Sequence, residues 1–157
     1  MKNLRTSMLC MCIMLFSFCT YAQDQKLPVN EPDYNKPKLF NSLPDYVQVN
    51  IANLSALLNS PLGHDVSINL GSNSPFIFEG HVVSTASKYE NTIQSVVVRS
   101  TNFPGARLTF SKITNADGTF SYTGRIISFQ HGDLFELQNQ NGQFALIKKK
   151  FNDLVNE

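Results

Sequence analysis

The 157-residue sequence contains no tryptophan, and its three cysteines, Cys10, Cys12 and Cys19, all fall within the first twenty residues. The rest of the chain has no thiol, which excludes disulfides, cysteine nucleophiles and thiolate metal sites there. An excess of one charge is also missing, because 13 Lys and Arg face 12 Asp and Glu and the net charge is +1. This balance gives no reason to expect nucleic acid or another polyanion as a partner.

Long apolar runs are absent as well. The longest one, from Met8 to Cys19, is shorter than the ~20 residues that a membrane-spanning helix needs. It follows a basic start and precedes Thr20-Tyr21-Ala22, which places small residues at the −3 and −1 positions of a cleavage site. We therefore predict a signal peptide over residues 1–22, no transmembrane segment, and a secreted or periplasmic protein that begins at Gln23.

The exported part of the chain divides at about residue 45. Residues 23–45 hold four of the seven prolines, no glycine and mostly polar side chains. Such a composition offers little apolar surface to offset the entropy of ordering. We predict a Pro-rich flexible leader over 23–45 and a single β-rich domain over 46–157.

The domain begins with a short strand and a helix. Apolar residues alternate with polar ones from Tyr46 to Ile51, which is typical of a strand with one buried face. Asn50 is a suitable N-cap, and Ile51, Leu54, Leu57 and Leu58 share one side of a helix. The sequence predicts a helix over Asn50–Asn59 that packs on a sheet.

All eight glycines fall between Gly63 and Gly142, where the pattern indicates strands separated by turns. Phe103-Pro104-Gly105 is typical of a type II turn, and Asn141-Gly142 is a strong hairpin signal. Short connections require antiparallel neighbours in chain order, since parallel strands need long crossovers. We expect a mainly β protein, a twisted antiparallel meander of about seven strands that forms a half-barrel with one short helix packed on it.

Motifs for catalysis are lacking, including Gly-x-Ser-x-Gly, His-Glu-x-x-His and Gly-rich phosphate loops. The spacing of His64, His81 and His131 is not that of metal ligands on one element. His131-Gly132-Asp133 joins an imidazole to a carboxylate, but Gly and Asp are also the residues of a tight turn, and we favour the turn. We predict no catalytic, metal-binding or cofactor-binding residue and no enzymatic activity.

One stretch has a family resemblance. Leu54-Ser-Ala-Leu-Leu-Asn-Ser-Pro-Leu-Gly63, then Val66-Ser-Ile-Asn-Leu70 and Phe78-Glu-Gly80, resembles the propeptide regions of secreted bacterial zinc metalloproteases over residues 46–85. The block from Ser111 to Lys149 resembles exported Bacteroidota domains to which no activity is attached. The 157 residues contain no zinc motif, so the resemblance implies a stand-alone relative of a prodomain. Such domains cover the cleft of a partner or template its folding.

We therefore expect a non-catalytic, prodomain-like or inhibitor-like module that binds another exported protein, with a protease as the leading candidate, through a sheet edge. The outermost strands of the meander should be Val66–Leu70 and Gln143–Lys148, and the lysines after Ile147 should protect the second. A small-ligand or lipid-binding half-barrel, an enzyme and a purely structural envelope protein are the alternatives. The candidate protein-binding residues are Val66, Ser67, Ile68, Asn69, Leu70 and, as an exposed anchor in a turn, Phe103.

Overall fold

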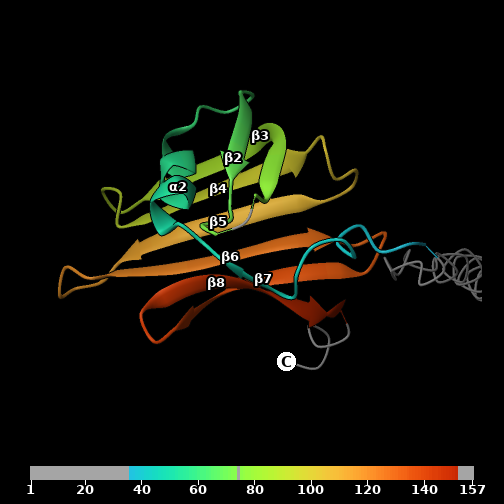
Figure 1. Ribbon diagram of the computed structural model, residues 1–157. Helices are drawn as coiled ribbons and strands as arrows, with labels where there is room; N and C mark the ends of the chain where they lie inside the picture. Colours follow the sequence, from blue (N-terminus) through green and yellow to red (C-terminus); the bar gives the residue numbers. More distant parts are fainter. Residues whose placement is uncertain (1–35, 74, 152–157) are drawn as a thin grey trace, which may run out of the picture. The chain divides into compact units, whose positions relative to one another are not determined.

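The computed structural model describes residues 36–73 and 75–151. The predicted signal peptide and residues 23–35 of the predicted leader lie outside the described residues. The domain is built from eight strands and one short helical segment (Figure 1). In chain order these elements are β1 Tyr46–Gln48, α2 Ile51–Ala56, the 3-10 turn η2 Leu57–Asn59, β2 Asp65–Asn69, β3 Ile77–Lys88, β4 Ile93–Ser100, β5 Arg107–Thr114, β6 Phe120–Ser128, β7 Asp133–Gln140 and β8 Gln143–Lys150.

The eight strands form one antiparallel sheet in the order β1-β8-β7-β6-β5-β4-β3-β2. From β2 to β8 each strand pairs with the next in the chain, as the short connections require. The fold is therefore the mainly β, antiparallel meander that the sequence predicts, with eight strands rather than about seven.

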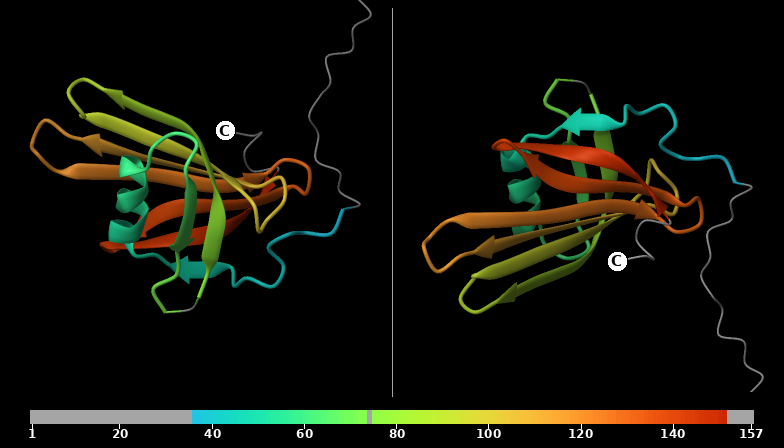
Figure 2. Two further views of the ribbon diagram at one scale, coloured as in Figure 1. Left: turned by 90° about the horizontal axis from the view of Figure 1, so that it is seen from above. Right: turned by 90° about the horizontal axis from the view of Figure 1, so that it is seen from below.

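The sheet curls into a half-barrel. A β-bulge between Val82 and Ser84 breaks the register of β3 against β4, and bulges bend the strand that carries them. The first part of β3 and all of β2 consequently turn across the remaining strands (Figure 2). At one end the two edges of the sheet meet, because Val49 forms an isolated bridge with Gly71 and the Ser72 N–H donates to the Gln48 carbonyl (2.8 Å).

The predicted turns are present. Gly105 has a φ of +83° and the Ala106 N–H donates to the Phe103 carbonyl (2.9 Å), as a type II turn requires. Asn141 and Gly142 both have positive φ, at +54° and +86°, which is the type I′ geometry of a two-residue hairpin. These turns fix the register of the meander.

The helical segment also begins where the sequence predicts. The Asn50 side chain accepts a hydrogen bond from the Ala52 N–H (3.0 Å), and Leu54 and Leu57 are buried. They pack in the main core with side chains from the sheet. Its largest completely buried members are phenylalanines: Phe40, Phe76, Phe78, Phe110 and Phe135.

Residues 36–45, which the sequence analysis assigns to the leader, pack against this core in the structure. We call them the strap. Phe40 is completely buried, and Leu39 and Leu43 contact the core beside it. The Phe40 ring lies 5.4 Å from the Phe135 ring and 5.5 Å from the Phe103 ring, measured between centroids. The described domain therefore includes the strap as well as the strands that begin at Tyr46.

The prediction that Gln143–Lys148 is an outermost strand is wrong. β8 lies between β7 and β1, since Tyr46–Gln48 pairs with Ala145–Ile147. The lysines that follow Ile147 do not guard an open edge. Lys148 instead holds the chain that leads into β1, with its Nζ 2.8 Å from the Leu43 carbonyl oxygen and 3.0 Å from Asp45 Oδ1.

Candidate sheet-edge binding site

Among the strands that the structure describes, β2 is an edge strand of the sheet and pairs only with β3. Its pairing register determines which backbone groups remain available. The Leu70 N–H donates to the Phe76 carbonyl and the Val82 N–H to the His64 carbonyl, so the even-numbered residues of β2 exchange hydrogen bonds with β3. The N–H and C=O groups of Asp65, Ser67 and Asn69 therefore point away from the sheet.

One of these outward groups has a partner. The Asn53 side chain of α2 donates to the Asn69 carbonyl (3.1 Å) and covers that end of the edge. Within the described part of the chain, the outward N–H and C=O of Ser67 have no backbone partner. An unpaired edge of this kind is a template for another strand.

A groove of about 520 Å³ runs along the β2 edge. Its β2 wall includes residues that face both sides of the sheet, from Asp65 to Asn69, and its other wall comes from the helical segment. On that wall Asn53, Ala56 and Ser60, the residue after the segment, are small or of moderate size, and Leu57 is the one large side chain. Small side chains on the far wall leave space beside the edge, and the volume lies in the range of ligand sites.

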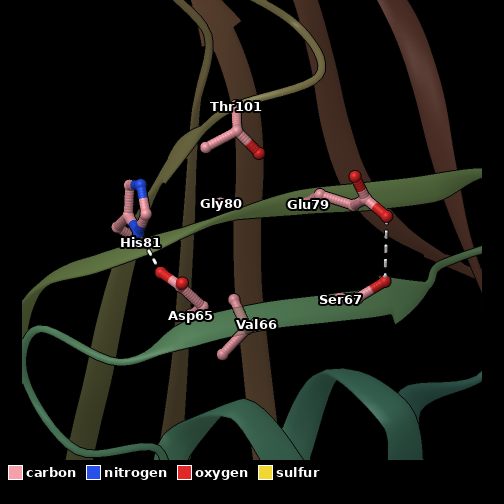
Figure 3. Close-up of a pocket in the computed structure, with 7 residues that line it drawn as sticks. All are labelled: Asp65, Val66, Ser67, Glu79, Gly80, His81 and Thr101. Atoms are coloured by element: carbon pink, nitrogen blue, oxygen red, sulfur yellow. Dashed lines mark hydrogen bonds and ion pairs between the residues drawn. The ribbon is translucent and has the colours of Figure 1, made fainter.

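The outer face beside this edge carries two cross-strand pairs. Asp65 lies opposite His81, and Ser67 lies opposite Glu79 (Figure 3). His81 Nδ1 contacts Asp65 Oδ1, and the Ser67 hydroxyl donates to Glu79 Oε1 (3.4 Å). Both members of the Asp65–His81 pair are largely exposed, with 79% and 54% of their side-chain surface accessible. These pairs line a second, smaller hollow of about 330 Å³ together with Val66, Gly80 and Thr101.

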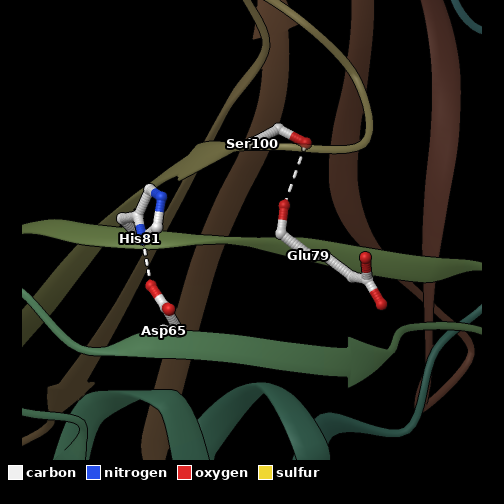
Figure 4. Close-up of polar contacts among 4 residues, drawn as sticks. All are labelled: Asp65, Glu79, His81 and Ser100. Atoms are coloured by element: carbon white, nitrogen blue, oxygen red, sulfur yellow. Dashed lines mark hydrogen bonds and ion pairs between the residues drawn. The ribbon is translucent and has the colours of Figure 1, made fainter.

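The end of β4 and the loop after it support β3 at this site. The Ser100 hydroxyl donates to the Glu79 carbonyl (3.1 Å), which Figure 4 shows beside the Asp65–His81 pair. Asn102 adds two bonds, because its side chain accepts from the Glu79 N–H (3.1 Å) and donates to the Ile77 carbonyl (2.8 Å). The backbone of β3 behind the edge is thus held from β4.

The six predicted binding residues separate into three groups. Ser67 and Asn69 are exposed on the outer face of β2, whereas Ile68 and Leu70 are buried and Val66 packs partly against the core. Phe103 is not an exposed anchor, because its ring packs against those of Phe40, Phe76 and Phe78. β2 contributes its outward backbone and its polar face, and the inward side chains hold it to the core.

Sequence reasoning missed Asp65, Glu79 and His81 around this edge. Glu79 and His81 reach β2 only through the register with β3, which the irregular connection after Asn69 does not reveal in the sequence. The alternation of Val66, Ile68 and Leu70 was the one signal available. It implies that Asp65, Ser67 and Asn69 share the opposite face.

His131 and Asp133 lie elsewhere and hold the strap. His131 Nδ1 lies 2.8 Å from the Pro37 carbonyl oxygen, and the buried Asp133 carboxylate accepts from the Leu39 N–H (2.6 Å). Lys38 Nζ donates to the His131 and Gly132 carbonyls (2.8 and 2.7 Å). This geometry agrees with the interpretation of His131-Gly132-Asp133 as a turn. The turn also attaches the strap to the sheet.

Over residues 36–73 and 75–151, no group of three His, Cys, Asp or Glu side chains is placed to hold a metal ion. No helix of that region is long and apolar enough to cross a membrane. Comparisons with protein-family models, with curated proteins and with solved structures found no match.

Proposed function

We propose that the protein is a non-catalytic binding module that takes an extended segment of another exported protein onto the β2 edge. The observation that carries the proposal is the outward backbone of Ser67, which has no backbone partner among the described residues and faces a groove of about 520 Å³ along the edge of the sheet. In recognition by strand addition, main-chain hydrogen bonds supply affinity and alternate side chains supply specificity.

The other edge of the sheet is less suited to this task. β1 has only three residues, and the outward Gln48 carbonyl already accepts the Ser72 N–H. The Asn73 side chain also donates to the Gln48 side chain (2.7 Å). β2 is longer, and its middle residue is open.

The packing of the core supports protein recognition over the binding of a small apolar ligand. The inward phenylalanines are completely buried against one another and against the strap. The two grooves beside β2 are lined by polar as well as apolar groups, among them Asp65, Ser67 and Glu79. The resemblance of residues 46–85 to metalloprotease propeptides favours a protease as the partner, which the module would cover or inhibit.

A matched pair of variants tests this proposal. Ser67→Pro removes the outward N–H without removing a hydrogen bond to β3, whereas Ser67→Ala keeps the N–H. The exported protein should retain a specific protein from the culture fluid or periplasm of its own organism, and the identified partner, once purified, should bind wild type and Ser67→Ala alike. If the partner is a protease, its activity should fall on binding.

Ser67→Pro should weaken binding of the purified partner at least about tenfold, while thermal unfolding shows that the variant is folded. Equal binding by folded Ser67→Pro would overturn the proposal. So would the co-purification of a lipid or small apolar molecule with a protein that binds no partner, a result that favours the ligand-binding alternative.

A further inference from the structure

The charges beside the β2 edge indicate the chemistry of the segment that binds there, an inference that rests on the proposed function. Two carboxylates, Asp65 and Glu79, lie on the outer face next to the edge. His81 is the other titratable group of that hollow. Arg99 lies opposite His81 on β4, one strand farther from the edge. The part of the outer face nearest to an added strand therefore carries the two carboxylates, and the arginine lies farther away.

The alternation of a strand determines which of its side chains meets these carboxylates. A residue of the added strand opposite Ser67 points its side chain over the outer face, as Ser67 does. Ser67 is small and exposed, so a long side chain can extend across it. Asp65 is then its diagonal neighbour, and Glu79 lies two strand spacings away, about 10 Å. A lysine or arginine at this position reaches both carboxylates.

The flanking residues of the added strand point to the opposite side, into the groove between β2 and the helical segment. Ala56, Leu57 and Val66 line this groove, and Ala56 leaves space for an apolar side chain of moderate size. Ser60 and Asn53 leave its ends polar. This side of the groove suits aliphatic residues and disfavours a second charge, which would lose its hydration there.

We propose that the partner segment is an extended chain that alternates basic with aliphatic residues and places a lysine or arginine opposite Ser67. Charge complementarity of this kind selects the partner and its register on the edge. An acidic segment on the same edge would place like charges across from Asp65.

Two blocked hexapeptides serve as probes, one alternating Val with Lys and the other alternating Val with Glu. NMR titration of the exported protein should show the amides of Ser67 and Asn69 shifting with the Lys peptide at millimolar concentration or below. The Glu peptide should bind at least about tenfold more weakly than the Lys peptide. Added salt should weaken the binding of the Lys peptide, because it screens the charge pairs.

The double variant Asp65→Asn, Glu79→Gln should bind the Lys peptide about threefold to tenfold more weakly than wild type, which is the scale expected for two exposed charge pairs. Glu136→Gln, on β7 and away from β2, is the matched control and should leave the affinity for the Lys peptide unchanged. Equal binding of both peptides, or an unchanged affinity in the double variant, would overturn this inference. If Ser67→Pro still abolishes binding of both peptides in that case, edge binding stands; if Ser67→Pro has no effect, the proposed function itself fails.

Discussion

Gly80 lies in β3, directly behind the β2 edge and opposite Ser100 of β4. A Cβ atom at this position would overlap the backbone carbonyl of Arg99, which cannot rotate away as the end of a side chain can. The close approach of β3 to β4 at this point therefore requires glycine. Since Val66 pairs with Gly80, the position of the edge depends on it as well.

We expect Gly80→Ala to lower the free energy of unfolding by about 1–3 kcal/mol, the usual cost of overpacking a filled site. Gly124→Ala is the matched strand control, because a Cβ there would meet its nearest neighbours at an ordinary 3.4 Å. Its cost should stay below about 1 kcal/mol. Chemical denaturation measures both values, and equal stability of the two variants would show that the Arg99 carbonyl does not exclude a Cβ atom at position 80.

At the scale of elements, the sequence allowed most of the meander to be predicted. Alternation located the strands, and Pro104-Gly105 and Asn141-Gly142 located two turns, because local backbone preferences determine these features. The pairing of β1 with β8 could not be predicted in this way. It joins Tyr46–Gln48 to Ala145–Ile147 across about a hundred residues, and no local signal in a three-residue strand indicates its partner.

The packing of the strap against the core could not be predicted either, because it too depends on residues far along the chain. Leu39, Phe40 and Leu43 stand among polar residues and prolines without a helical or strand period, so nothing in the pattern indicates that Phe40 is buried. Its place depends on contacts with Phe103 and Phe135, far along the chain. The turn at His131–Asp133 completes the attachment through hydrogen bonds to Pro37 and Leu39.

Because of these contacts, we expect two substitutions in that turn to lower the free energy of unfolding by different amounts. Asp133→Ala leaves the Leu39 N–H without its buried acceptor and should lower the free energy of unfolding by about 1–3 kcal/mol. His131→Asn affects an exposed contact and should cost less than about 1 kcal/mol.

Hydrogen exchange of the strap amides separates this explanation from a general loss of stability. In Asp133→Ala the amide of Leu39 should exchange faster than those of β4, whereas His131→Asn should leave the pattern nearly unchanged. Neither substitution should change binding at the β2 edge. Stoichiometric zinc binding that His131→Asn abolishes would contradict the structural role of this residue.

As a whole, the domain over residues 36–73 and 75–151 is a curled sheet whose inner face is filled and whose two edges differ. One edge is short and joined at Gln48 to Ser72, and the other presents Ser67 beside a groove. The sequence allowed the β2 edge to be predicted, because β2 begins the meander and its apolar residues alternate. It did not reveal the acidic surroundings, since Glu79 and His81 come to the edge through β3.

Amide hydrogen exchange of the complex reports directly on whether a partner pairs with the outward backbone of β2. In the free protein, the amides of Asp65, Ser67 and Asn69 should exchange quickly, and those of Val66 and Ile68, which face β3, more slowly. On binding the partner, the Ser67 amide should become protected by at least about tenfold, while Val66 and Ile68 change little. A tight complex in which the Ser67 amide still exchanges as fast as in the free protein would rule out strand addition at the β2 edge.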